Sequence, residues 1–235
     1  MTRNLFSLAS VVALLATPAC LAENSLPSGD TNDAATGGPR TGSILPWKVG
    51  NVWTYRVTDG TSVTTKTMTV GALEMVGGTG PHQNDMANKV VTKKDDGTDQ
   101  TISWQAQEGD LIVRYREQSF MKSTGALELE EHWDPHKLHV DGSAAHLVGS
   151  ASWLEVYQET KLPVGDQPTT AEARDAWGVD AEHESVTVPA GTYDAIVLTK
   201  AGGSTLKRYW YMPGVGKIKE TGGQTEELVS FEPAP

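Results

Sequence analysis

The sequence predicts a mainly β protein with an antiparallel, strongly curved sheet, either a half-barrel or a barrel, and little helix. From residue 47 onward, apolar and polar residues alternate over short segments, which is the period of a half-buried strand. Turn signals such as Asp59-Gly60 and Asp96-Gly97 separate these segments. The 24 glycines and 12 prolines, with almost no helical periodicity, also favour many short strands joined by turns.

The first element, residues 1–19, is predicted to be a signal peptide outside the fold. Its apolar run from Leu5 to Ala16 has 12 residues, which is too short to span a bilayer but typical of the hydrophobic region of an export signal. No later segment reaches the length of a transmembrane helix.

The next element is the only cysteine of the chain. Thr17-Pro18-Ala19-Cys20 resembles the lipobox of bacterial lipoproteins, in which the cysteine receives a diacylglycerol. Thr17 and Pro18 depart from the usual pattern. We therefore expect lipidation at Cys20, and the alternative is ordinary cleavage after Ala19 or Ala22, which would leave the protein secreted. A single cysteine also excludes an intramolecular disulfide.

Residues 20–46 are predicted to be the lipidated cysteine and a flexible tether, because this stretch is polar, small and rich in Gly and Pro. Residues 47–235 are predicted to form one β-rich domain. A short helix or a strand remains open for residues 170–177. The predicted strands are 52–57, 62–70, 87–94, 100–107, 111–117, 127–130, 153–160, 184–188, 193–200, 206–212, 217–220 and 227–231.

The domain also contains a weak internal sequence repeat. Three residues have a counterpart later in the chain within a similar local sequence. The pairs are Trp53 and Trp153, Thr92 and Thr199, and Trp104 and Trp210, and they are separated by 100, 107 and 106 residues. We interpret this as two related β-meanders, residues 47–117 and 148–231, joined by a segment around residues 118–147.

Aromatic residues are the candidate binding residues of this sheet. A curved sheet has a concave face that side chains, a ligand or a partner must fill. Core packing is the simpler interpretation of these aromatic side chains, and a cleft for a hydrophobic ligand is the functional one. The candidates are Trp53, Tyr55, Trp104, Trp153, Tyr209 and Trp210.

Catalytic and metal-binding signatures are not found in the sequence. The densest histidine cluster is His132-x-Asp134-x-His136-x-x-His139, but Pro135 interrupts it and its spacing fits no zinc-enzyme motif, so we interpret these histidines as polar loop residues. Gly149-Ser150-Ala151-Ser152 lacks the closing glycine of a nucleophile elbow. We therefore expect no catalytic residues, no metal and no cofactor.

Net charge excludes a further class of partner. The chain carries 19 basic and 30 acidic residues, a formal net charge of −11, whereas nucleic-acid binding needs a basic face. Nucleic acid is therefore not an expected partner.

Two motifs carry a family resemblance. Val186-Thr-Val-Pro-Ala-Gly-Thr-Tyr-Asp-Ala195 and Tyr209-Trp-Tyr-Met-Pro-Gly-Val-Gly216 resemble the V-x-V-P-A-G-x-[FY]-x-A and Y-W-Y-x-P-G-V-G patterns of uncharacterised bacterial envelope lipoproteins. The resemblance implies a β-sheet domain similar at the fold level to the lipoprotein carriers LolA and LolB. In physical terms the first motif predicts a hairpin, in which Pro189 ends one strand, Gly191 turns the chain and Tyr193 begins the returning strand in the core.

These observations together predict a lipid-anchored, non-enzymatic lipoprotein of the cell envelope with a structural or protein-interaction role. The alternatives are a carrier of a lipid or other hydrophobic ligand and, less favoured, an envelope hydrolase. Its expected partners are the membrane, through the lipid anchor, and a hydrophobic ligand or an envelope protein. Leu21 is not the aspartate that marks retention in the inner membrane of some bacteria, so the outer membrane is expected.

Overall fold

The computed structural model describes residues 42–95, 99–203 and 205–235. The predicted signal peptide, Cys20 and the predicted tether up to residue 41 lie outside the described residues. Within them the chain forms twelve strands and one short 3-10 turn. They are β1 (Val52–Asp59), β2 (Ser62–Met75), β3 (Met86–Lys94), β4 (Asp99–Glu108), β5 (Leu111–Phe120), β6 (Leu127–Asp141), η2 (Ala144–His146), β7 (Ser152–Pro163), β8 (Thr169–Val188), β9 (Gly191–Gly202), β10 (Thr205–Met212), β11 (Gly216–Thr221) and β12 (Thr225–Glu232).

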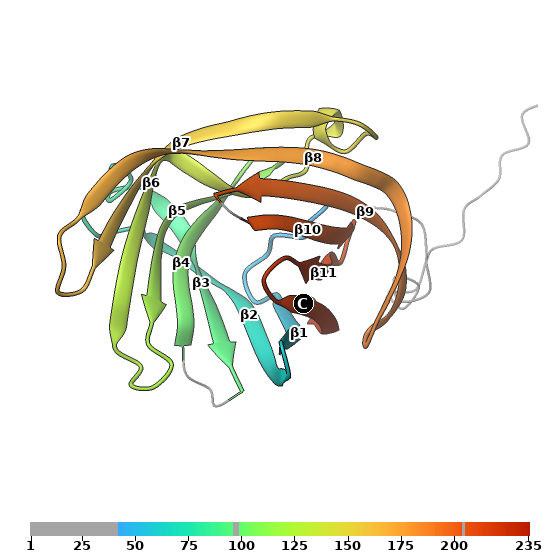
Figure 1. The fold of residues 1–235 in the computed structure, drawn as a ribbon, viewed down its shortest axis with the longest axis horizontal. Helices are drawn as coiled ribbons and strands as arrows, with labels where there is room; N and C mark the ends of the chain where they lie inside the picture. The colour runs from blue at the N-terminus through green and yellow to red at the C-terminus, as the bar shows by residue number, and fades with distance from the viewer. Residues whose placement is uncertain (1–41, 96–98, 204) are drawn as a thin grey trace, which may run out of the picture. The chain divides into compact units, whose positions relative to one another are not determined.

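The strands form a closed antiparallel barrel (Figure 1). Each strand pairs with the next one along the chain, and β12 pairs back onto β1, with Val52 opposite Glu232 and Thr58 opposite Thr225. The predicted mainly β, antiparallel and curved sheet is confirmed, and closure decides between the half-barrel and the barrel. Closure leaves the sheet without a free edge strand.

Strand β6 corrects two predictions. It extends from Leu127 to Asp141, well beyond the predicted strand 127–130, and the histidines expected in a loop therefore lie within it. Arg114 pairs with Lys137 and Arg116 pairs with His132, so residues 133–136 bulge away from β5. A proline lacks an N–H donor and is tolerated at such a bulge, which explains why Pro135 does not end the strand.

Strand β8 settles the open choice at residues 170–177 in favour of a strand. It ends at Val188, and β9 begins at Gly191 with φ +139°. Tyr193 follows in the core at 5% exposure. The hairpin predicted from the Pro189-Ala190-Gly191 turn is therefore confirmed, and Figure 1 shows this long hairpin curving around the side of the barrel that contains β10 and β11.

The larger hydrophobic core lies where β1 meets the C-terminal strands. Trp53 is fully buried and donates its indole N–H to the carbonyl of Val215 at 2.6 Å. Gly216 has φ +104°, and a Cβ there would lie 2.8 Å from Leu45 Cδ1, so the close approach requires glycine. Ile44 and Leu45 belong to this core. The packed chain therefore includes residues 44 and 45, before the predicted domain start at residue 47.

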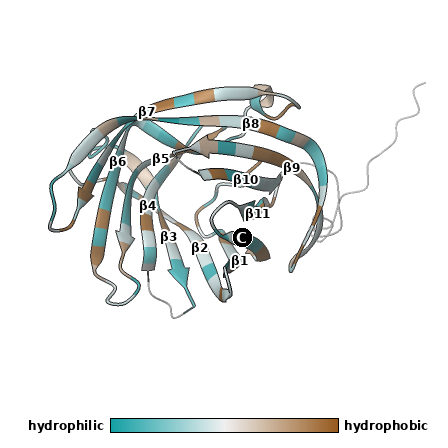
Figure 2. Cartoon of the chain, in the orientation of Figure 1, coloured by the Kyte–Doolittle hydropathy of each residue, from teal (hydrophilic) through white to brown (hydrophobic). Residues whose placement is uncertain are grey.

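Hydropathy alternates along many of the strands (Figure 2). In β1 the alternate residues Trp53, Tyr55 and Val57 are buried, as the period-2 pattern predicts. Strand β9 differs, because Ala195, Ile196, Val197 and Leu198 are all at most 5% exposed. Both faces of this strand are covered, so its sequence is continuously apolar.

Candidate functional site

A cavity of about 290 Å³ lies inside the barrel. Strands β1–β6 and β10–β12 all contribute to its lining, so the cavity lies within the sheet that they close. Its volume is near the lower end of the range for small-molecule sites, roughly 300–1,000 Å³. The charged lining residues are Lys66, Arg114, Glu117, Lys207, Lys217, Glu220 and Glu226.

The strand register places these charged side chains in the same space as aromatic ones. Directly opposed residues of an antiparallel pair point to the same face of a sheet. Tyr55 of β1 is opposite Lys66 of β2, and Tyr209 of β10 is opposite Glu220 of β11. All four residues line the cavity.

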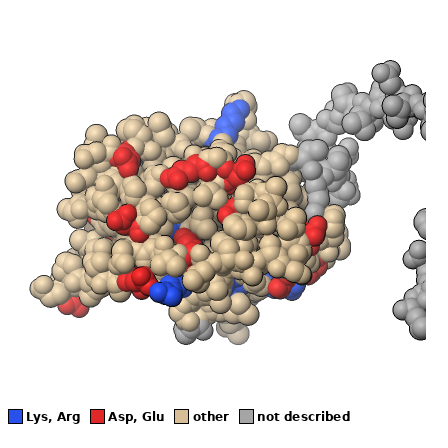
Figure 3. All heavy atoms as spheres, turned by 90° about the horizontal axis from the view of Figure 1, so that it is seen from above, with Lys and Arg blue, Asp and Glu red and all other residues tan. Residues whose placement is uncertain are grey.

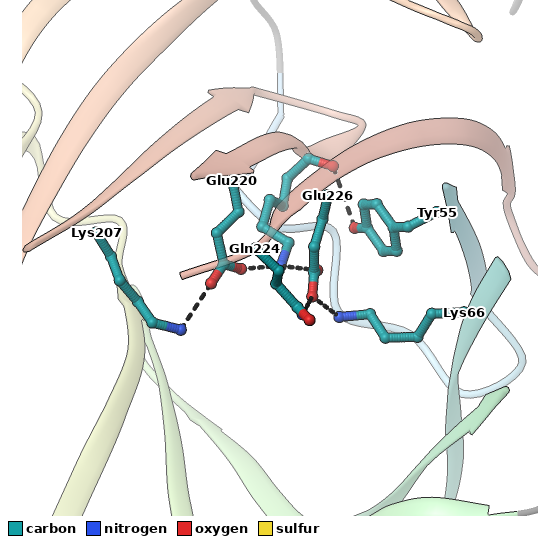
Figure 4. A network of polar contacts seen from close by, with 7 residues as sticks. Tyr55, Lys66, Lys207, Glu220, Gln224 and Glu226 are labelled. Carbon is teal, nitrogen blue, oxygen red and sulfur yellow. Dashed lines mark hydrogen bonds and ion pairs between the residues drawn. The ribbon is translucent and has the colours of Figure 1, made fainter. Parts of the chain in front are cut away.

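Three lysines and two glutamates form a network on one wall of the cavity (Figure 4). Lys217 is central, because its Nζ lies 2.5 Å from Glu220 Oε2 and 2.8 Å from Glu226 Oε2. Lys207 Nζ donates to the other oxygen of Glu220 at 2.8 Å, and Lys66 Nζ donates to the other oxygen of Glu226. Together with Gln224, which donates to Glu226 at 2.7 Å, these residues are called the cavity network: Lys66, Lys207, Lys217, Glu220, Gln224 and Glu226.

Burial and charge pairing set the protonation of this network. Burial raises the pKa of Glu226, but the ammonium groups of Lys217 and Lys66 outweigh it and lower the pKa to about 2. Burial opposes ionisation of Glu220 as well, and Lys217 and Lys207 hold its pKa below the usual value. Burial and repulsion by Lys217 lower the pKa of Lys66 to about 8, although Glu226 raises it. Both carboxylates are therefore ionised at neutral pH.

A different wall of the cavity carries Arg114, Glu117 and His139. Arg114 Nη1 is 3.7 Å from Glu117 Oε2, which is longer than a hydrogen bond. His139 Nδ1 lies 2.9 Å from the amide oxygen of Gln105, so Nδ1–H donates and Nε2 keeps its lone pair. Burial lowers the pKa of His139 well below its usual value, and the positive charge of Arg114 lowers it further. His139 is therefore neutral at pH 7.

Two of the predicted aromatic binding residues, Tyr55 and Tyr209, line the cavity. The hydroxyl of Tyr55 donates to the backbone carbonyl of Lys217 at 3.1 Å. Trp53 and Tyr55 both belong to the hydrophobic core described above, but Trp53 does not line the cavity. The sequence alone places Trp53 and Tyr55 on the same strand face, and the structure adds that only Tyr55 reaches the cavity lining.

Trp104 and Trp210 do not line the cavity but lie in matching surroundings. Trp104 of β4 donates its indole N–H to Glu74 of β2 at 3.0 Å, and Trp210 of β10 donates to Glu184 of β8 at 2.8 Å. An arginine guanidinium lies over each ring, 4.1 and 4.8 Å from the centroid. These two tryptophans therefore have structural partners of the same kind.

Trp153 joins a row of stacked rings. Its ring centroid is 4.0 Å from that of His146 and 6.0 Å from that of Trp177, and Trp177 lies 5.9 Å from Tyr209. The structure thereby connects Trp153 with Tyr209, and the row reaches the cavity at Tyr209.

A second buried polar network lies on strands β6–β9. Trp177 Nε1 donates to Glu155 at 3.0 Å, and Glu155 also accepts the backbone N–H of Leu138 at 2.5 Å. The hydroxyl of Tyr157 donates to Asp175 at 2.9 Å. Similar contacts join Lys200 to Asp175, and Trp133 and Lys137 to Glu159. We call this the β6–β9 network: Trp133, Lys137, Glu155, Tyr157, Glu159, Asp175, Trp177 and Lys200.

The predicted histidine cluster is divided by the fold. His132 Nε2 lies 2.8 Å from Glu130 Oε1, His136 Nδ1 is 3.8 Å from a carboxylate oxygen of Glu108, and His139 lines the cavity. In the described part of the chain, no group of three or more His, Cys, Asp or Glu residues is placed to hold a metal ion.

Sequence reasoning missed the charged lining of the cavity. A usable signal is a charge in phase with apolar residues on one strand face. Lys66 is in phase with Met68 and Val70, and Glu226 is in phase with Leu228. Such residues point to the same side as the core, and inward charges of this kind need partners.

Comparisons with known proteins identify a shared fold for this chain but assign it to no family. No family model matches the chain, and no curated protein matches it. A solved structure from Bacteroides fragilis, described as an exported protein with a YmcC-like fold, aligns with 82% of this chain and 100% of its own at 11% identity and a TM-score of 0.51. One from Parabacteroides distasonis, described as a lipoprotein, aligns with 81% of this chain and 99% of its own at 13% identity and a TM-score of 0.44.

The first of these likenesses shows that the chain shares a fold with the Bacteroides fragilis protein. Separately, no helix among the residues that the structure describes is long and apolar enough to cross a membrane.

Proposed function

We propose that the chain is a lipid-anchored lipoprotein of the bacterial cell envelope with a non-enzymatic role, structural or in binding a partner protein. The observation that carries the anchor is the position of the only cysteine, Cys20, directly after the apolar run of the signal. The Bacteroides fragilis protein that shares the fold is described as exported, which agrees with this proposal. The outer membrane is the proposed location, since Leu21 follows the cysteine.

The protonation of the two glutamates in the cavity network bears on the hydrolase alternative. An effective general base or acid at neutral pH has a pKa near 7. Glu226 and Glu220 are instead held ionised by buried lysines, with lowered pKa values, so they are weak bases. Neither glutamate therefore supports a general-base role of the kind that a hydrolase needs.

The polar lining also bears on the carrier alternative. An acyl chain in this cavity would lie against ammonium and carboxylate groups, which are stabilised by polar partners and not by hydrocarbon. If the barrel carries a ligand, the lining favours a small polar one over a lipid tail.

Membrane fractionation of Cys20→Ala tests the anchor. Several acyl chains hold a protein on a membrane, because each buried CH₂ contributes about 0.8 kcal/mol. The parent protein is expected in the membrane fraction and the variant in the soluble fraction. Ser25→Ala, a small change in the predicted tether, is the matched control and is expected to stay with the membrane. A Cys20→Ala variant that remains membrane-bound like the parent would show that the anchor is wrong.

A further inference from the structure

We propose that the cavity binds a small organic monoanion, a carboxylate, through the guanidinium of Arg114. This inference goes beyond the envelope role proposed above. It concerns the barrel alone and does not depend on Cys20, so fractionation and ligand binding can fail independently.

Arg114 is the cation of the cavity whose donors are least used. Its Nε is buried and has no hydrogen-bond partner among the described residues, and its nearest carboxylate oxygen, on Glu117, is 3.7 Å away. A guanidinium carries five N–H donors in a planar fork, and buried donors without a partner are costly. By contrast, Lys66, Lys207 and Lys217 each contact a carboxylate at 2.8 Å or less.

The charge balance of the lining favours one negative charge on the ligand. The lining contains four basic residues and three glutamates, and His139 is neutral, which leaves a single positive charge. The chain as a whole has a net charge of −11, and the face in Figure 3 shows many more acidic than basic side chains. The net charge of the cavity lining is therefore opposite in sign to that of the whole molecule, and a monoanion would neutralise the lining.

The uncharged part of the lining suits a ligand that also carries hydroxyl or amide groups. Thr92, Thr101 and Ser103 contribute hydroxyl groups, and Tyr209 and Tyr211 add phenol rings. A planar carboxylate matches a guanidinium with two parallel hydrogen bonds, which an ammonium group cannot reproduce. The volume of about 290 Å³ limits the ligand to a small molecule.

Calorimetric titration of the full-length processed protein tests this proposal. The probes are gluconate, lactate and N-acetylglycinate, each compared with an uncharged counterpart: sorbitol, propylene glycol and N-methylacetamide. At least one carboxylate is expected to bind, and its counterpart to bind at least ten-fold more weakly. Arg114→Gln is expected to weaken carboxylate binding at least ten-fold. Arg208→Gln, which alters an arginine paired with Asp180 and Glu184 outside the cavity, is the matched control and is expected to leave binding unchanged.

A second variant gives a gain of affinity that a merely structural role of Arg114 would not produce. Glu117→Gln removes the carboxylate that lies nearest to Arg114 among the described residues, so carboxylate binding is expected to tighten about three- to ten-fold. This variant keeps Arg114 and tests the proposal even if Arg114→Gln does not fold. The proposal is overturned if none of the three carboxylates binds the parent protein, if Arg114→Gln binds as tightly as the parent, or if Glu117→Gln does not tighten binding.

Discussion

The barrel contains two buried charge networks that satisfy their carboxylates in different ways. In the β6–β9 network, the acids accept hydrogen bonds from rigid aromatic donors, as Glu155 does from Trp177 and Asp175 from Tyr157. In the cavity network, Glu220 and Glu226 are paired with flexible lysines. Lysines also contact carboxylates of the β6–β9 network, as Lys200 does with Asp175 and Lys137 with Glu159, but each acid of that network has an aromatic donor as well. The cavity of about 290 Å³ is lined by the cavity network, and no residue of the β6–β9 network lines it.

The largest expected effect comes from removing a charge in the cavity network. Glu226→Gln leaves Lys66 and Lys217 buried with one carboxylate fewer, and we expect it to lower the free energy of unfolding by about 3–5 kcal/mol, the usual cost of breaking a buried pair. Urea unfolding measures this. Glu227→Gln is the matched control, because Glu227 pairs with the half-exposed Arg56, and it is expected to cost about 0–1 kcal/mol. An equal loss of unfolding free energy in the two variants would contradict the conclusion that Glu226 stabilises buried lysines.

A smaller effect is expected in the β6–β9 network. Trp177→Phe removes the indole donor of the buried carboxylate of Glu155, at an expected cost of about 1–3 kcal/mol. Trp153→Phe changes the neighbouring ring of the stack, whose Nε1 has no hydrogen-bond partner among the described residues, and is expected to cost less. Thermal and urea unfolding of the two variants compare them directly. A larger loss for Trp153→Phe would show that stacking, not the hydrogen bond, dominates.

A pH dependence of the stability is also expected from the cavity network. The pKa of Glu226 is about 2 in the folded protein, below the usual glutamate value of about 4.3 in an unfolded chain. Between these values the unfolded chain binds more protons, so the free energy of unfolding falls as pH is lowered from about 4.5 to 2. Unfolding curves across this range measure the slope. Glu226→Gln should flatten it, and an unchanged slope would assign the dependence to other carboxylates.

Much of the fold could be predicted from the sequence, because alternation and turn residues are local signals. The strand at Trp53 and the hairpin at Pro189 are examples. The continuation of β6 through Pro135 could not be predicted, because the bulge that tolerates the proline depends on the register with β5. The first half of β8 has few apolar residues, so alternation alone did not decide between a helix and a strand at residues 170–177.

The candidate site was predictable only in part, because it depends on contacts between distant strands. Tyr55 and Tyr209 were identified as aromatic residues of a concave face, but their charged neighbours come from opposite ends of the chain, as Lys66 and Glu226 do. The duplication into residues 47–117 and 148–231 stays a prediction. The matching partners of Trp104 and Trp210 favour it.

The pairing of β1 with β12 has a consequence for the order of assembly. Val52 and Glu232 lie near opposite ends of the barrel sequence, so the first strand has no partner on one side until the last strand has folded against it. Every hairpin in between can form locally, since each strand pairs with its successor. The final seam is thus the step that waits for nearly the whole polypeptide, and a chain cut short before Thr225 would leave both terminal edges open to a second molecule.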